Sequence, residues 1–89
     1  MKCITITIVN KLGMHARASA KFVSLAAEFN SEVTVAHNSH HVNGKSIMGI
    51  MMLAAGKGIV LELCANGDDE DQAVAALCQL IKNRFGEEA

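Results

Sequence analysis

The fold is indicated first by residues 4–29, ITITIVNKLGMHARASAKFVSLAAEF. Isoleucine alternates with threonine from Ile4 to Ile8, which is the period of a strand with one buried face. After a short break, apolar residues recur at helical spacing, at Ala18, Phe22, Leu25 and Phe29. The stretch therefore predicts a strand, a turn and an amphipathic helix in direct succession.

His15 stands where this segment breaks into the helix, within residues 10–17, NKLGMHAR. The free backbone N–H groups of a first helical turn and the positive end of the helix dipole favour negative charge. The guanidinium of Arg17 can add paired donors, and neutral imidazole is itself a good nucleophile. The junction therefore predicts a phosphate site at which a phosphoryl group can attach to His15. The alternative is that His15 is only a solvated turn residue.

Composition limits the remaining possibilities. A chain of 89 residues predicts one domain over residues 1–89, and a formal net charge of −1 gives no general attraction to nucleic acid or anionic lipid. The longest apolar stretch, near residues 47–55, is shorter than the roughly 18 residues that a membrane-spanning helix needs. No signal-peptide pattern opens the chain. We therefore expect a cytoplasmic protein with no nucleic-acid partner and no membrane insertion.

The cysteines are an odd number and widely separated, at Cys3, Cys64 and Cys78. They form no Cys-x-x-Cys pair, and each has apolar neighbours. This pattern predicts reduced thiols that are buried or half-buried.

Five further elements follow the first strand and helix. Two strands at residues 32–37 and 40–43 are joined by a plausible two-residue turn at Asn38-Ser39. A short helix at residues 47–53, a fourth strand at 59–64 with extensive burial, and a last helix complete the chain. The last helix has acidic residues in its first turn (68–71), basic residues near its end, and Gly86 as its expected C-cap. The order β-α-β-β-α-β-α predicts an α+β fold with one antiparallel sheet, covered on one side by helices.

Two segments with matching spacing resemble the HPr family of histidine-containing phosphocarrier proteins: residues 11–17, KLGMHAR, and residues 43–49, NGKSIMG. The resemblance extends over essentially the whole chain. It implies a two-layer open-faced β-sandwich with strand order 1-4-2-3 and three helices on one face. It also implies that the second strand runs parallel to the first. The family usually has proline after the arginine, where this chain has Ala18.

The resemblance also implies roles for individual residues. His15 would accept a phosphoryl group on its Nδ1 from phosphorylated enzyme I of the phosphoenolpyruvate:sugar phosphotransferase system and pass it to an enzyme IIA. Arg17 would stabilise that group. The protein would then be a phosphoryl carrier rather than an enzyme, would need no cofactor or metal, and would act as a monomer.

Ser46 has two interpretations. As the residue before the short helix, it is an N-cap worth about 1 kcal/mol. By resemblance, it is also the regulatory site that an HPr kinase/phosphorylase modifies in many bacteria, where added negative charge beside an apolar surface would weaken partner binding. The alternative function is therefore a regulatory interaction module controlled through Ser46, including a role in the nitrogen branch of the system.

The short helix at residues 47–53 is apolar on every side. Its inward face should hold Ile47, Ile50 and Met51 or Leu53, whereas Met48 and Met52 should form an adaptable exposed patch. The alternative is that all these methionines fill the core. Lys21, Lys45 and Lys57 could add a basic rim. The expected partner-contacting residues are Met14, Lys21, Lys45, Ile47, Met48, Met51 and Met52.

Two other motifs lack residues that their sites would need. His37, His40 and His41 could bind zinc, but hairpin residues alternate faces and no cysteine or carboxylate completes a ligand set. Gly44-Lys45-Ser46 resembles the end of a nucleotide-binding P-loop, yet Ser39 stands where that motif needs glycine. We therefore expect no metal site and no nucleotide site.

Overall fold

The computed structural model describes residues 1–53 and 55–89. Its elements follow the predicted order and are β1 (Lys2–Thr7), α1 (Ala16–Ala26), β2 (Glu32–His37), β3 (His40–Asn43), α2 (Ile47–Met52), β4 (Val60–Asn66), α3 (Glu70–Lys82) and a short 3-10 turn, η1 (Arg84–Gly86). The strands form one sheet of order β1-β4-β2-β3, in which all neighbours are antiparallel. β1 and β2 are therefore parallel and separated by β4, which confirms the implied topology.

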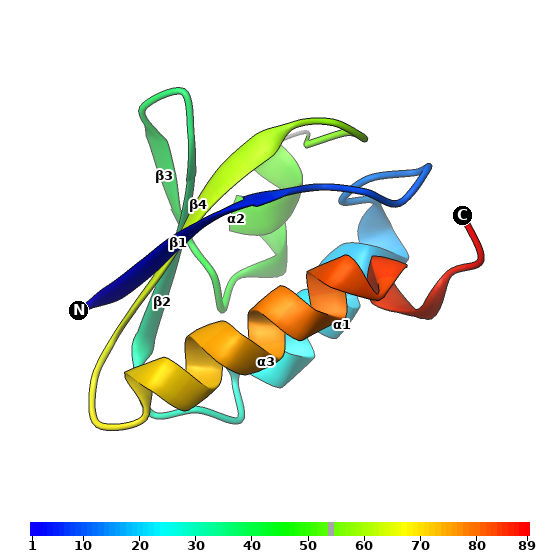
Figure 1. Cartoon of the computed structure of the whole chain (residues 1–89). Coiled ribbons are helices and arrows are strands. Elements are labelled where there is room, and N and C mark those ends of the chain that lie inside the picture. The colour runs from blue at the N-terminus through cyan, green and yellow to red at the C-terminus, as the bar shows by residue number, and fades with distance from the viewer. Residues whose placement is uncertain (54) are drawn as a thin grey trace.

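The three helices lie on the same side of the sheet, and the opposite face is open (Figure 1). Burial follows this division. In β4, Leu61, Leu63 and Ala65 are buried against the helices, whereas Val60 and Glu62 on the other face are exposed. The prediction of extensive burial for this strand is therefore wrong for its outer face, because no helix covers it.

The largest fully buried side chains are Phe22 of α1 and Phe85 of η1. Helix α1 ends at Ala26, so Phe29, which the apolar spacing assigned to the helix, lies beyond it and packs against a small cluster of Ala65, Ala73 and Val74. Most of the main core cluster is aliphatic, with side chains from both layers meeting between the sheet and the helices.

The end of α3 differs from the prediction. The helix stops at Lys82 with Asn83 as its C-cap, and Gly86 instead ends η1 at a φ of +80°. Arg84 and Phe85 before it also have positive φ angles, 57° and 54°. Such angles are costly for residues with a side chain. Burial of the Phe85 ring in the core offsets this cost.

Cys3 and Cys64 form a disulfide, and Cys78 is a free, half-buried thiol. The prediction of three reduced thiols is therefore wrong for the first two. They are 61 residues apart in the sequence, but they lie directly opposite each other in the β1–β4 register, with their Cα atoms 4.1 Å apart. The sequence alone does not reveal this register.

Asp69 joins the start of α3 to the loop after α1. Its Oδ2 accepts a hydrogen bond from the Asn30 backbone N–H (2.8 Å), and its Oδ1 accepts from the Ser31 backbone N–H (2.9 Å) and the Ser31 hydroxyl (2.5 Å). The Ser31 hydroxyl, followed by the Asn30 N–H, lowers the pKa of Asp69. The acidic run at residues 68–71 therefore does more than complement the helix dipole.

Reduction of the Cys3–Cys64 bond should lower the free energy of unfolding by about 2–4 kcal/mol, because the open form regains chain entropy when it unfolds. Urea unfolding with and without dithiothreitol measures the difference. Cys78→Ser should keep the difference, and Cys3→Ser should abolish it. Equal stability of the oxidised and reduced wild type would contradict the stabilising role.

Asp69→Asn should destabilise the protein at neutral pH, because the charged acceptor is lost. A carboxylate with a lowered native pKa stabilises the fold above its unfolded value of 3.8, and this contribution disappears as the pH falls through the native value. The stability difference between wild type and Asp69→Asn should therefore shrink on acidification, as measured by urea unfolding from neutral pH to about pH 2.5. Asp68→Asn is the control and should follow the wild type. A difference that does not change with pH would contradict the assignment.

Candidate phosphate site

The turn before His15 is built on a close backbone contact. Gly13 has a φ of +63°, and a Cβ atom there would lie 2.4 Å from the Ala55 carbonyl oxygen and 2.7 Å from the Gly56 Cα. The next residue, Met14, donates its backbone N–H to the same Ala55 oxygen (2.8 Å). Only glycine fits both the angle and the space. The turn is therefore fixed against the segment that follows α2.

Met14 was expected on the partner-binding surface, and the structure corrects this expectation. Its side chain is only 6% exposed and belongs to the main core cluster. The buried Met14 side chain anchors the turn to the core, and the side chain of the next residue, His15, is partly exposed at the surface. The helical spacing of the sequence could not show this, because Met14 precedes the helix.

His15 is the N-cap residue of α1, as predicted, with extended backbone angles (φ −70°, ψ 179°). Its backbone carbonyl accepts the first helical hydrogen bond from Ser19 (2.8 Å), and the Ser19 hydroxyl bonds to the Met14 carbonyl (3.0 Å). The backbone N–H groups of residues 16–18 precede that first bond and are available to an anion. Ala18, in place of the family proline, is fully buried within the intact helix.

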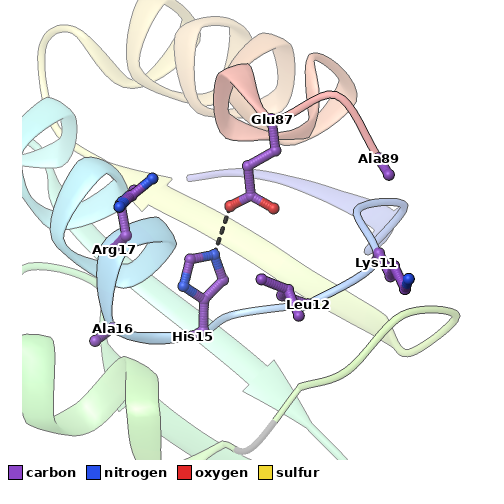
Figure 2. Close-up of a pocket in the computed structure, with 7 residues that line it drawn as sticks. All are labelled: Lys11, Leu12, His15, Ala16, Arg17, Glu87 and Ala89. Carbon is purple, nitrogen blue, oxygen red and sulfur yellow. Dashed lines mark hydrogen bonds and ion pairs between the residues drawn. The ribbon is translucent and has the colours of Figure 1, made fainter.

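Glu87 lies beside the His15 ring, as Figure 2 shows. Its Oε2 is 2.5 Å from Nε2 of His15, and the two side chains are 16% and 27% exposed. Its Oε1 accepts a hydrogen bond from Nδ2 of Asn10 (3.1 Å). The hydrogen bond to His15, followed by that from Asn10, lowers the pKa of Glu87. The carboxyl group is therefore ionised at neutral pH.

Glu87 was missed in the sequence. It is 72 residues from His15 and lies in a short acidic tail that resembles an ordinary solvated C-terminus. The signal that could have identified it is the preceding Phe85-Gly86 pair, since a buried aromatic residue followed by glycine ties down the end of a chain.

The surface around His15 is hollowed. Seven residues line this depression, namely Lys11, Leu12, His15, Ala16, Arg17, Glu87 and Ala89. His15 and Arg17, which the sequence predicts for one phosphate site, both line this depression. Nε2 of His15 faces Glu87, whereas the other ring nitrogen, Nδ1, has no hydrogen-bond partner among residues 1–53 and 55–89. The arrangement presents one ring nitrogen, a guanidinium and helix-end amides to a common space.

The predicted lysines have other contacts. The Lys21 ammonium donates to the Phe85 carbonyl (2.6 Å), and the Lys45 ammonium donates to the Phe29 carbonyl (2.7 Å). Lys21 therefore ties the C-terminal segment to α1. Lys57 is exposed. The basic rim stays a prediction, with two of its three members held by backbone oxygens.

Helix α2 exposes an apolar surface. Met48 and Met52 are 73% and 78% exposed, and Ile47 and Met51 are also exposed, whereas Ile50 and Leu53 are buried. We refer to Ile47, Met48, Met51 and Met52 as the α2 patch. The alternative that all the methionines of α2 fill the core is therefore wrong, as is the placement of Ile47 in the core. Of the two candidates for the last inward position, Leu53 is the buried one. Leu12, missed in the sequence, adds a further exposed apolar side chain in the depression beside His15.

Ser46 caps α2 as predicted. Its Oγ accepts a hydrogen bond from the Gly49 backbone N–H (3.1 Å). It adjoins the α2 patch in sequence, so a charge added at Ser46 would change the electrostatic potential of that surface.

The hairpin histidines form no cluster with further metal-ligating side chains in the part of the chain that the structure describes. There, no group of three or more His, Cys, Asp or Glu side chains is placed to hold a metal ion. His37 instead contacts the Val60 carbonyl through Nδ1 (3.2 Å), and His40 and His41 are exposed.

None of the helices in residues 1–53 and 55–89 is long and apolar enough to cross a membrane.

The chain is similar in sequence and in fold to proteins of one known family. The family model described as "PTS HPr component phosphorylation site" matches residues 2–83. A phosphocarrier protein HPr of Neisseria meningitidis serogroup A is 59% identical over 83 residues, which are 93% of each chain. The crystal structure of HPr-C-His from Thermoanaerobacter tengcongensis superposes with a TM-score of 0.97 at 50% identity, over 100% of both chains.

A second structure from that organism, an HPr dimer, superposes with a TM-score of 0.79 at 50% identity and covers 98% of this chain and 100% of its own. The chain therefore belongs to the HPr family, the phosphocarrier proteins of the phosphotransferase system. This confirms the resemblance seen in the two sequence motifs.

Proposed function

We propose that the protein relays a phosphoryl group from phosphorylated enzyme I, through Nδ1 of His15, to an enzyme IIA. The observation that carries this proposal is the partly exposed imidazole at the N-cap of α1, with Arg17 at the wall of the same depression. As a carrier it would act as a monomer, without cofactor or metal, and would be a reactant rather than a catalyst.

The site supports transfer through positioning and charge. The Nδ1 lone pair forms the new N–P bond while the bond to the donor breaks, and the bonding electrons leave with the donor. Negative charge spreads over the three oxygens of the phosphoryl group during this step. The first-turn N–H groups and the Arg17 guanidinium can bind these oxygens. Because the site is open and has one guanidinium at its wall, it can hold the group without trapping it.

We place this relay in the cytoplasm, where the family partners would supply and accept the phosphoryl group. Reducing compartments keep most protein thiols reduced. In such a compartment the Cys3–Cys64 disulfide would be reduced to two thiols.

The regulatory alternative is favoured by one observation of its own. Ser46 is half-buried at the start of α2 and adjoins the exposed α2 patch. A kinase that phosphorylates Ser46 would add roughly two negative charges there. In that alternative, including a nitrogen-branch role, control of binding is the output and His15 is idle.

His15→Ala should abolish labelling by phosphoenolpyruvate and enzyme I, because no other side chain offers the same nucleophile in the depression. The measurement is the amount of acid-labile, base-stable phosphate on the protein. His40→Ala, another exposed histidine, should label normally. Label that persists in His15→Ala would contradict the carrier function.

Arg17→Ala should slow transfer about a hundredfold with the fold retained, and Arg17→Lys should recover only part of the rate.

Ser46→Asp should weaken binding to enzyme I about tenfold or more. The substitution adds a negative charge beside the apolar α2 patch, and this charge would have no partner in the complex. Aspartate is also a good N-cap, so helix α2 should be kept. Isothermal calorimetry compares this variant with Ser46→Ala, which loses the cap but adds no charge, and with Ser39→Asp at the hairpin turn. If Ser46→Asp binds as tightly as Ser39→Asp, charge at this serine does not control docking.

Met48→Asp should weaken binding to enzyme I by about 2 kcal/mol or more, because it places a charge in the centre of an apolar contact. Val60 is an exposed apolar residue of β4 on the open face of the sheet. Val60→Asp is therefore a matched control and should bind like the wild type. Equal loss in both variants would show that the α2 patch has no special role.

A further inference from the structure

Two residues from distant parts of the chain, Glu87 and Asn10, lie on the Nε2 side of His15. Glu87 contacts Nε2 at 2.5 Å, and Asn10 contacts the other carboxylate oxygen at 3.1 Å. Asn10 lies 77 residues from Glu87 in the sequence, and Asn10 is fully buried. From this geometry we propose that Glu87 and Asn10 are positioning residues that fix the tautomer of His15 and leave Nδ1 as the nucleophile. This inference rests on the proposed carrier function.

The carboxylate determines which ring nitrogen holds the proton. A neutral imidazole has one N–H group and one lone pair, on different nitrogens. An ionised carboxylate can only accept hydrogen bonds, so the ring nitrogen that faces Glu87 must donate. The proton is therefore on Nε2, and the lone pair is on Nδ1, which faces away from Glu87 toward the start of α1 in Figure 2.

Asn10 fixes the carboxylate in turn. Its Nδ2 group donates to the Gly13 carbonyl (2.8 Å) as well as to Glu87, so it joins the turn before His15 to the C-terminal segment. Its Oδ1 is buried with no hydrogen-bond partner among the described residues. Rotating the amide by half a turn would direct that oxygen at two acceptors and lose both hydrogen bonds. The orientation is therefore set by its neighbours, at the cost of one unpaired oxygen.

The backbone that carries Glu87 is also held. Lys21 donates to the Phe85 carbonyl at 2.6 Å, the Phe85 ring is buried, and the Glu87 backbone N–H bonds to the Arg84 carbonyl at 2.9 Å. Glu87 therefore projects from an anchored segment rather than from a loose chain end.

The same contact acts during transfer. When Nδ1 forms its bond to phosphorus, the Nε2 proton stays on the ring, which becomes a cation while the donor takes the electron pair of the broken bond. Glu87 then faces a positive N–H group and can stabilise it. When the acceptor attacks phosphorus, the N–P electrons return to Nδ1 and the neutral Nε2–H tautomer is restored. No other reactant is needed.

The test compares Glu87→Ala with Glu88→Ala, its exposed neighbour, which removes the same charge without a contact to His15. The first readout is the pair of imidazole ¹⁵N shifts of His15 at about pH 8.5, where free imidazole is neutral. In wild type and Glu88→Ala, Nε2 should have the shift of a protonated nitrogen and Nδ1 that of a free lone pair. In Glu87→Ala the two shifts should move toward each other as both tautomers become populated.

The second readout is the rate of phosphoryl transfer from enzyme I. Glu87→Ala should be at least about tenfold slower than Glu88→Ala. Asn10→Ala should also be slower, and in the Glu87→Ala background it should cost less than it does in the wild type, because the part of its effect that acts through Glu87 is already lost there. Unchanged ¹⁵N shifts or an unchanged rate in Glu87→Ala would overturn the inference while leaving the carrier function intact. If the wild type takes up no phosphate, the carrier function fails and the ¹⁵N shifts still decide the tautomer.

Discussion

A backbone contact that leaves no room for a side chain determines where His15 lies. Gly13 presses against the Ala55 carbonyl and the Gly56 Cα, and Met14 inserts into the core directly after it. The chain can then continue only outward, so the next residue begins α1 at the surface. The exposure of His15 and its position before the first turn of α1 follow from this path of the backbone.

The site combines opposite charges on two sides of one ring. Arg17 and the first turn of α1 favour a negative group near Nδ1, whereas Glu87 places a carboxylate at Nε2. A carrier must bind its phosphoryl group and also release it, and a surface with many cations would favour only binding. The separation of the two charges by the imidazole ring lets the carboxylate stabilise the ring cation without lying on the phosphoryl side.

The sequence predicted those features that depend on local patterns. The alternation at Ile4, Ile6 and Ile8 located β1, and the break at Gly13, with His15 and Arg17 after it, indicated the candidate site at the start of α1. Contacts between distant segments were not predictable: the pairing of Cys3 with Cys64 needs the β1–β4 register, and Glu87 reaches His15 only because Phe85 is buried. Met14 was misplaced for the same reason, since its burial depends on the position of the segment after α2.

The most direct test of this chemistry is NMR of the ¹⁵N-labelled protein after phosphorylation by enzyme I. A one-bond coupling between ³¹P and Nδ1 of His15, with a proton still on Nε2, is the expected result. Coupling of phosphorus to Nε2, or phosphate on any residue other than His15, would contradict it.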